Sequence, residues 1–524
     1  MIPGMRAFSV RGLLLRAAVG FALLDAGCAA LGAGGEARSG AKPSPALRAH
    51  SIVAPQVARD LPVTGPAALA MDSSGNSYVV ASVVSSPLLA LDGPSGQSHG
   101  DSTLFLASYD AKGEKRWALG DVGDGNNPAF GVSAAVTSDG TLAAIGHFAG
   151  TFSINGGVGG CVDAGGTCLS SASPIDLLAG YEARSGTGKW AHQFNDGANG
   201  NLLQVAANPN DSSQRHGNRI AVCGFANATA PSDLLGPSAV AVPHNTIILG
   251  VFTSAGEKLW ATQYIAAGAV NAAPNADCNA IAVDDDGDVI AAGTFSGSSL
   301  TFGNLPALYG PDSSFRKFIW VAKFNGSTGA PERAVAFSGA MGLPAPTSLA
   351  VDAHGDVALA GKFTAHLAFG STLLSSAGGS DAFVTKLNAQ LSPLWAARLG
   401  GPGVDEARGV AVDSAGDVIT VGFFSRTATA SGTSQTIAAS LPHSANPFVL
   451  KINGLTGSTD QVVGYPDNTS SSATSIAVNR YGPSALDTLA ITGQYGATLL
   501  FPPPAGAITS VGLLDAWLVI AKSH

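Results

Sequence analysis

Carboxylates that alternate along one short segment are the first candidates for chemistry. Asp284, Asp286 and Asp288 stand at alternate positions beside Gly287, and hard oxygen ligands of this kind suit Ca²⁺. In a calcium-binding loop the glycine follows the third alternate ligand, whereas Gly287 precedes it. Gly287 instead aligns with glycines that recur along the chain, at Gly75, Gly140, Gly355 and Gly416. We therefore interpret the segment as an Asp-rich hairpin turn and expect no metal site.

Histidine, the side chain most often used as a general base, does not cluster along the chain. The ten histidines are scattered, and the sequence holds no His-Glu-x-x-His, phosphate-binding Gly-rich or Cys-x-x-Cys motif. No catalytic residue is therefore assigned. Convergence of distant histidines in the fold stays open, and the candidates are His99, His147, His192, His216, His244, His366 and His443.

Residues 1–30 have the pattern of an export signal, with basic residues, an apolar core at 17–24 and then small residues. The core is too short to span a bilayer. The order Leu-Asp-Ala-Gly-Cys that ends at Cys28 resembles a bacterial lipobox, in which the thiol carries a lipid anchor, although Asp25 stands where an apolar residue is usual. Cleavage by ordinary signal peptidase near Ala30 is the alternative. Either route predicts an exported protein of the periplasm, outer membrane or cell surface, or a secreted one.

Four cysteines remain once Cys28 is lipidated or removed. Cys161 and Cys168 lie in one Gly-rich stretch, where we predict a local disulfide, since an exported chain meets an oxidising compartment. Cys223 and Cys278 are left to form a second disulfide or to stay as buried thiols.

Composition narrows the class of protein. The chain has 67 glycines and 29 prolines among 524 residues, as short strands joined by turns require. The net charge is −9 and no Lys/Arg cluster is interleaved with aromatic residues, so a nucleic-acid partner is not expected.

An internal repeat runs along the chain. The clearest copy reads TSLAVDAHGDVALAGKF at 347–363 and continues as DAFVTKLNAQLSPLWAARLGG at 381–401. The first half contains two alternating apolar runs around an Asp/Gly turn, and the second half contains two more strands. Seven copies are found, and the others begin near residues 67, 131, 203, 278, 407 and 474.

Four short antiparallel strands per copy form a sheet with two apolar faces, which must stack on neighbouring sheets. Radial closure also removes the exposed sheet edges. The sequence therefore predicts an all-β, seven-bladed β-propeller. The last copy ends after its third strand, and the apolar segment 50–58 precedes the first copy, so we predict that this segment completes the last blade. Residues 50–524 would form one domain and residues 31–49, rich in Gly, Ala, Ser and Pro, a flexible tether.

Two residue types recur at fixed places in the copies. Tryptophan occupies one position of the fourth strand, where a large ring fills the space between diverging blades. Lysine recurs in the third strand, where we predict a charge at the outer edge. The residues are Trp117, Trp190, Trp260 and Trp395, and Lys323, Lys386 and Lys451.

The hairpin VAVDSAGDVITVGFF and the strands of DAFVTKLNAQLSPLWAARLGG resemble the bacterial SBBP-type β-propeller repeat. The resemblance implies the fold and no activity, because that family has no general catalytic motif. ARSGTGKW at 183–190 and DAKGEKRW at 110–117 are similar to the tryptophan-docking motif of pyrroloquinoline quinone propellers. The adjacent cysteine pair and calcium-binding set of those enzymes are absent, so no cofactor is expected.

The long variable segments all belong to connections that leave one side of the ring, and we expect them to crowd one mouth of the central channel. This distribution favours an exported, monomeric, non-enzymatic scaffold that binds a protein, glycan or other envelope component, with no membrane contact beyond a lipid anchor. The alternatives are an exported hydrolase or lyase at the channel mouth, a purely structural role and a quinoprotein-like enzyme. The segments include 83–102, 148–175, 226–245, 295–315, 424–446 and 495–513.

Overall fold

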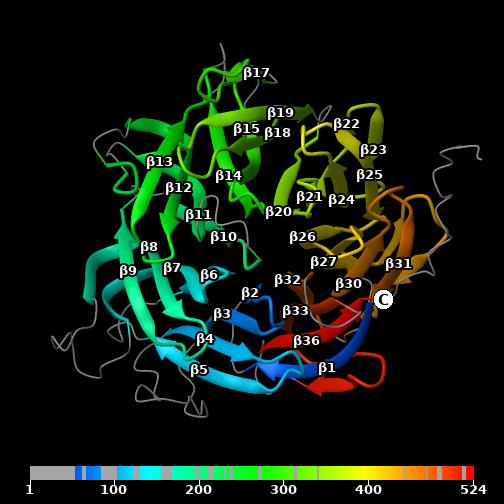
Figure 1. Cartoon of the computed structure of the whole chain (residues 1–524). Coiled ribbons are helices and arrows are strands. Elements are labelled where there is room, and N and C mark those ends of the chain that lie inside the picture. The colour runs from blue at the N-terminus through cyan, green and yellow to red at the C-terminus, as the bar shows by residue number, and fades with distance from the viewer. Residues whose placement is uncertain are drawn as a thin grey trace, which may run out of the picture. The chain divides into compact units, whose positions relative to one another are not determined.

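The computed structural model contains seven antiparallel sheets arranged in a ring, one for each blade (Figure 1). Six of them have four strands, and the fifth is extended to six strands by a hairpin that pairs with its outer strand. All described residues belong to one compact unit, residues 50–524, and none of them is in an α-helix. The structure describes residues 53–61, 67–83, 103–121, 130–154, 168–195, 201–210, 218–228, 232–236, 240–268, 274–310, 316–338, 342–441, 444–465, 467, 469–480, 487–509 and 515–523.

Each of the first six blades uses four strands in chain order, with the first strand nearest the ring centre. Blade 1 is β2 (Ala68–Met71), β3 (Ser77–Val83), β4 (Thr103–Tyr109) and β5 (Lys115–Asp121). Blade 2 is β6 (Phe130–Val136), β7 (Thr141–Ser153), β8 (Cys168–Glu182) and β9 (Gly188–Phe194). Blade 3 is β10 (Asn201–Ala207), β11 (Arg219–Ala228), β12 (Val242–Thr253) and β13 (Lys258–Tyr264).

The later blades follow the same order. Blade 4 is β14 (Asn275–Val283), β15 (Val289–Ser296), β18 (Phe318–Phe324) and β19 (Pro331–Ser338). Blade 5 is β20 (Ala345–Val351), β21 (Val357–Phe363), β24 (Asp381–Leu387) and β25 (Pro393–Gly400). Blade 6 is β26 (Glu406–Val412), β27 (Val418–Ser425), β30 (Ala445–Ile452) and β31 (Thr459–Gly464).

Blade 7 closes the ring and joins the two ends of the unit. It contains β32 (Ser472–Asn479), β33 (Asp487–Tyr495) and β36 (Asp515–Ser523), and its outermost strand is β1 (Val53–Leu61). β1 pairs with β36 in antiparallel register from Val53 opposite Ser523 to Leu61 opposite Ala516. The predicted seven-bladed fold and its closure by the N-terminal strand are therefore confirmed, and that strand extends three residues beyond the predicted end at 58.

Two faces of the ring differ, because successive strands run in opposite directions. The short-turn face carries the turns between the first and second and between the third and fourth strands of each blade. The long-connection face carries the links between the second and third strands and those leading to the next blade. Among the described residues, four of these links contain a further hairpin, and these are β16 (Ser299–Leu300) with β17 (Leu308–Tyr309), β22 (His366–Phe369) with β23 (Thr372–Ser375), β28 (Thr427–Ala430) with β29 (Thr436–Ala438), and β34 (Thr498–Leu500) with β35 (Ala507–Thr509).

The recurrent lysines are not outer-edge charges, so that prediction is wrong. The third strand lies inside the sheet, and Lys451 is fully buried, with its Nζ 2.6 Å from Asp413 and 3.5 Å from Asp417. Burying an ammonium group requires a paired carboxylate, and the hairpin turn between the first two strands supplies two. Lys323 and Lys386 pair in the same way with Asp284 and Asp288 and with Asp352 and Asp356.

The recurrent tryptophans are structural, as predicted. The Trp395 indole N–H donates to the Gly454 carbonyl oxygen of the next blade at 3.0 Å. A Cβ on Gly457 would lie 2.7 Å from the Trp395 ring, and Gly457 has φ +73°. Only glycine fits both this contact and this backbone conformation comfortably. Equivalent bonds run from Trp117 to Ala183, from Trp190 to Ser254 and from Trp260 to Gly326.

Candidate binding site in the central channel

The channel contains two cavities, one towards each face. The cavity on the long-connection side has a volume of about 470 Å³ and the one on the short-turn side about 220 Å³. Seven apolar side chains, one from the first strand of each blade, line both cavities and therefore mark the boundary between them. They are Leu69, Ala134, Val205, Ile281, Leu349, Val410 and Ile476.

β-Bulges shape the wall of the larger cavity. In six of the seven first strands the pairing register shifts by one residue near the long-connection end. A bulge leaves one extra residue and re-aims its side chain. Because the second strand passes close to the bulge, a Cβ on Gly422 would lie only 1.9 Å from the Glu406 carbonyl oxygen. The extra residues are Val132, Leu203, Asn279, Thr347, Arg408 and Thr474.

Hydroxyl groups beside the bulges bridge neighbouring blades. The Ser133 Oγ accepts the Val205 N–H at 3.1 Å, and the Ser348 Oγ accepts the Val410 N–H at 3.1 Å. The Thr474 hydroxyl donates to the Ala67 carbonyl oxygen at 3.0 Å across the closing junction. The wall is thus polar while its hydroxyls also stabilise the ring.

Arg408 is the one charged side chain among the described residues that line the larger cavity. Its guanidinium lies 4.6 Å above the Phe423 ring, and its Nη1 donates to the Ser472 Oγ at 3.1 Å. Its Nε lies 3.4 Å from Glu406, which also pairs with Lys362 at 2.9 Å. No motif in the sequence marked Arg408, because its place depends on the bulge.

The short-turn end of the channel is crossed by Arg480. Its Nη1 donates to the Val351 carbonyl oxygen of blade 5 at 2.6 Å, and its Nη2 lies 3.6 Å from the Asp285 carboxylate of blade 4. The Asn208 amide of blade 3 donates to the same carboxylate at 2.8 Å. Because Arg480 follows β32 of blade 7, four blades are linked across this end. The opposite end is the one that offers the larger cavity.

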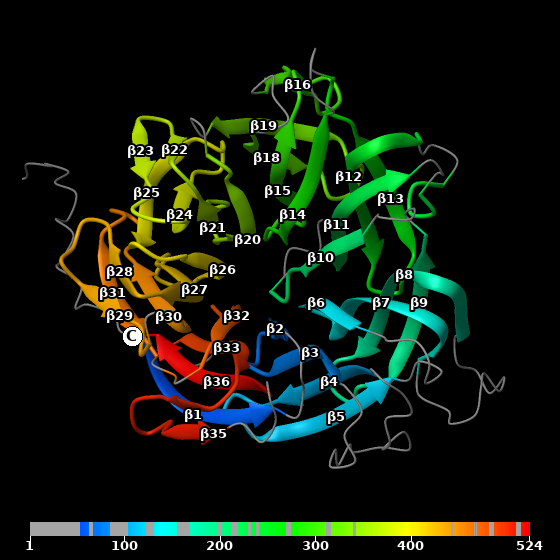
Figure 2. The ribbon, with the colours of Figure 1, turned by 180° about the vertical axis from the view of Figure 1, so that it is seen from behind.

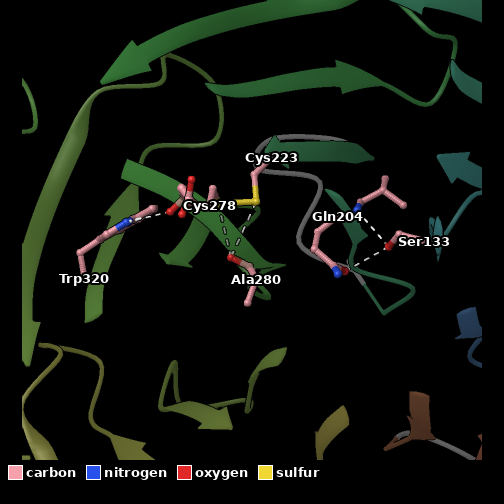
Figure 3. Close-up of a disulfide and its surroundings, with 8 residues drawn as sticks. Ser133, Gln204, Cys223, Cys278, Ala280 and Trp320 are labelled. Carbon is pink, nitrogen blue, oxygen red and sulfur yellow. Dashed lines mark hydrogen bonds between the residues drawn. A yellow bond between two sulfur atoms is a disulfide. The ribbon is translucent and has the colours of Figure 1, made fainter. Parts of the chain in front are cut away.

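A disulfide joins blades 3 and 4 close to the channel wall (Figure 3). It links Cys223 of β11 to Cys278 of β14, and both residues are fully buried. The sequence left this pair open between a disulfide and two thiols. Cys28 and Cys161 lie outside the described residues, so the lipid anchor and the Cys161–Cys168 pair stay predictions.

The histidines do not converge in the described part of the chain. His147 forms a dyad with Asp176, whose carboxylate is 2.6 Å from Nδ1 and 2% exposed. Its second oxygen accepts the Leu202 N–H at 2.9 Å. His192 instead contacts Trp190, and no group of three potential metal ligands occurs among the described residues. His244, His354 and His366 lie elsewhere, whereas His99, His216 and His443 are outside the described residues.

The Asp-rich segment is a hairpin turn, as interpreted from the sequence. The Asp284 carboxylate accepts the Asp286 N–H at 3.0 Å and the Asp288 N–H at 2.8 Å, and its other oxygen accepts a hydrogen bond from Lys323.

Gly96, Ser98 and Gly100 have the Gly-x-Ser-x-Gly spacing of a nucleophile elbow. They lie outside the described residues.

The hairpins of blades 4 to 7 lie at the outer rim of the ring rather than around the channel mouth, which corrects the expectation that these connections crowd the mouth (Figure 2). Their apolar side chains pack on the outer strand of the preceding blade. The pairs Tyr264 with Phe302, Phe337 with Phe369 and Tyr465 with Phe501 have ring centroids 4.7, 4.9 and 5.1 Å apart. The hairpins therefore fill the widening gap between blades, and the mouth is bounded by first-strand residues.

No family model and no curated protein matches the chain. Among solved structures, the Dos1 propeller is 9% identical, with 89% of this chain and 95% of that chain covered at a TM-score of 0.41. BamB from Moraxella catarrhalis is 11% identical, with 89% and 97% covered and a TM-score of 0.33. Quinohemoprotein alcohol dehydrogenase from Comamonas testosteroni is 10% identical, with 90% and 76% covered and a TM-score of 0.36.

At these identities the likeness concerns the fold alone. The resemblance to SBBP-type repeats stays a prediction. No helix among the described residues is long and apolar enough to cross a membrane.

Proposed function

We propose that this chain is an exported, non-enzymatic propeller that binds another component of the cell envelope through its long-connection face. Among a protein, a glycan and other components, the geometry favours a protein. The observation that carries this proposal is the distribution of exposed large apolar side chains. Of eleven such residues in the described part of the chain, eight lie in connections of this face, and these are Val240, Ile265, Tyr309, Leu343, Leu373, Val404, Leu441 and Leu500.

Exposed apolar side chains are common singly, so their uneven distribution is the informative feature. Among the described residues, the other three lie on outer strands or on the short-turn face, and these are Leu259, Leu394 and Leu455. The Cys223–Cys278 disulfide supports an oxidising compartment, in agreement with the export signal. Loops and hairpins held by a rigid ring are also the usual place for recognition.

The experiment is site-specific photocrosslinking in the cells that make the protein. A photoreactive phenylalanine analogue replaces Leu373, which is 63% exposed, or Val404, and the matched control carries it at Leu455, which is 84% exposed. We expect one discrete adduct from the first two positions and none from Leu455. Equal adducts from both faces, or none from the long-connection face, would reject the proposal.

The hydrolase alternative is favoured by one observation, the His147–Asp176 dyad. A buried carboxylate on Nδ1 fixes the tautomer and leaves Nε2 as a proton acceptor, which is how a general base is held. The test is hydrolysis of p-nitrophenyl esters and glycosides by the full chain and by His147→Gln. Turnover that disappears in the variant, with melting unchanged, would establish this alternative.

A further inference from the structure

We propose that the larger channel cavity binds a small organic monocarboxylate with an apolar body, with the carboxylate at Arg408. This inference goes beyond the proposed protein binding and does not depend on it. The charge of the wall is the first reason. The described residues that line the cavity include Arg408 and no carboxylate, so the local field favours an anion.

The arrangement around Arg408 is the second reason. Extra residues at the other bulges are neutral, and the bulge of blade 6 alone presents a cation. Glu406 is shared between Arg408 and Lys362, which leaves this group of three with one net positive charge. A guanidinium has five N–H donors, and the contacts to Ser472 and Glu406 account for two. The stacking on Phe423 holds the plane in place, which lowers the entropic cost of binding.

The floor of the cavity is the third reason. Val410 belongs to the seven-residue apolar ring and lies two residues along β26 from Arg408, which is about 7 Å of strand. The walls between these levels carry hydroxyl and amide groups, including Ser348 and Gln204. A ligand that reaches from Arg408 to the apolar ring has one anionic end and an apolar body of about six carbons, which spans the distance of about 7 Å between them. A phosphate or sulfate ion has no apolar part to cover the floor.

Titration of the full chain with hexanoate, followed by calorimetry, tests this inference. Hexanol, hexylammonium and acetate separate the contributions of the body and the charge. We expect hexanoate to bind more tightly than all three, and Arg408→Gln to weaken hexanoate binding about tenfold or more, because charge-assisted bonds are lost. The matched control is Arg426→Gln, since Arg426 is an exposed arginine of the same blade that does not line the cavity.

Ile476→Ser provides a second variant, which removes apolar surface from the floor and leaves Arg408 unchanged. We expect it to weaken hexanoate more than acetate. Absence of hexanoate binding up to about 10 mM, or equal affinities for hexanoate and hexanol, would overturn the inference. Equal affinities of the wild type and Arg408→Gln would also overturn it. The crosslinking result at Leu373 does not affect these outcomes, so the two proposals fail separately.

Discussion

The two faces of the ring are built by different rules. On the short-turn face, the same local arrangement returns in blades 4 to 6, where two turn carboxylates pair with a lysine of the third strand. This lysine is buried in blades 5 and 6 and partly buried in blade 4. On the long-connection face, the hairpins that the structure describes belong to blades 4 to 7, and they differ in length from blade to blade. The short-turn face therefore repeats the same contacts between residues from blade to blade. The hairpins of the long-connection face share only their position in the blade.

Both faces nevertheless fasten neighbouring blades. The short-turn face uses a tryptophan N–H on a turn carbonyl of the next blade, as in Trp395 to Gly454. The long-connection face uses aromatic packing by hairpins, as in Phe337 with Phe369. Directional bonds fix a sequence motif, whereas apolar packing accepts many sequences of suitable volume. This difference explains how one face can vary in sequence while the ring stays closed.

Lys451→Met is expected to have the largest effect on the fold. It removes the counter-charge of Asp413 and Asp417 in a fully buried site, which costs about 3–5 kcal/mol of unfolding free energy. The control is Lys317→Met on the other face, since Lys317 is 38% exposed and pairs with Asp277 at 3.4 Å. That change should cost less than about 1 kcal/mol. Similar urea-unfolding midpoints for both variants would contradict the contrast between the faces.

The next largest effect is a dependence of the unfolding free energy on pH, which comes from Asp405, a buried acid of the long-connection face. Asp405 is fully buried, and burial raises its pKa to about 7 while the Ser425 and Gly401 N–H groups partly oppose the shift. An acid with a raised folded pKa contributes stability below its unfolded pKa of about 3.8 and loses it as pH rises towards 7.

Wild-type unfolding free energy should therefore fall by about 3–4 kcal/mol between pH 4 and pH 8 relative to Asp405→Asn, whose amide does not titrate. The variant loses one of the two backbone bonds at every pH, so the slope and not the absolute stability is compared. Chemical denaturation at several pH values measures it. Parallel curves would show that Asp405 keeps an ordinary pKa.

Repetition made the scaffold predictable from the sequence. The alternating runs around Asp352 and Gly355 predicted a hairpin, and seven copies predicted a ring. The unfinished last copy predicted closure by the segment 50–58, which β1 confirms. These features follow from local periodicity and chain connectivity, which a sequence displays directly.

Features that depend on contacts between copies were not predictable. Lys451 and Asp413 are 38 positions apart in the sequence. They lie side by side only because the third strand of blade 6 folds back against the turn after the first strand. Arg408 faces the channel because a bulge shifts the register, and a one-residue shift has no signature in the pattern of apolar residues. Arg480 reaches blades 4 and 5 from blade 7 across the ring. Each case needs the three-dimensional closure before the residue acquires its role.

Trp395→Phe tests the tryptophan hydrogen bond that links neighbouring blades on the short-turn face. We expect a smaller loss of stability than from the two preceding changes. The indole is 8% exposed and donates to the Gly454 carbonyl oxygen, so the loss of this bond and of ring volume should cost about 1–2 kcal/mol. Phe369→Leu on the other face removes volume without a hydrogen bond and should cost about 1 kcal/mol. Thermal melts compare them, and a greater loss in Phe369→Leu would contradict the ranking.

Leu373→Ser should have the smallest effect and separates folding from recognition most sharply. Leu373 and Leu374 are neighbours on β23, and their exposed fractions are 63% and 6%, because successive side chains of a strand point to opposite sides. Leu373→Ser should change the unfolding free energy by less than about 0.5 kcal/mol, whereas Leu374→Ser should cost about 2–4 kcal/mol. If Leu373→Ser destabilises the ring as strongly as Leu374→Ser, the exposed side chains of this face serve the fold and are not reserved for a partner.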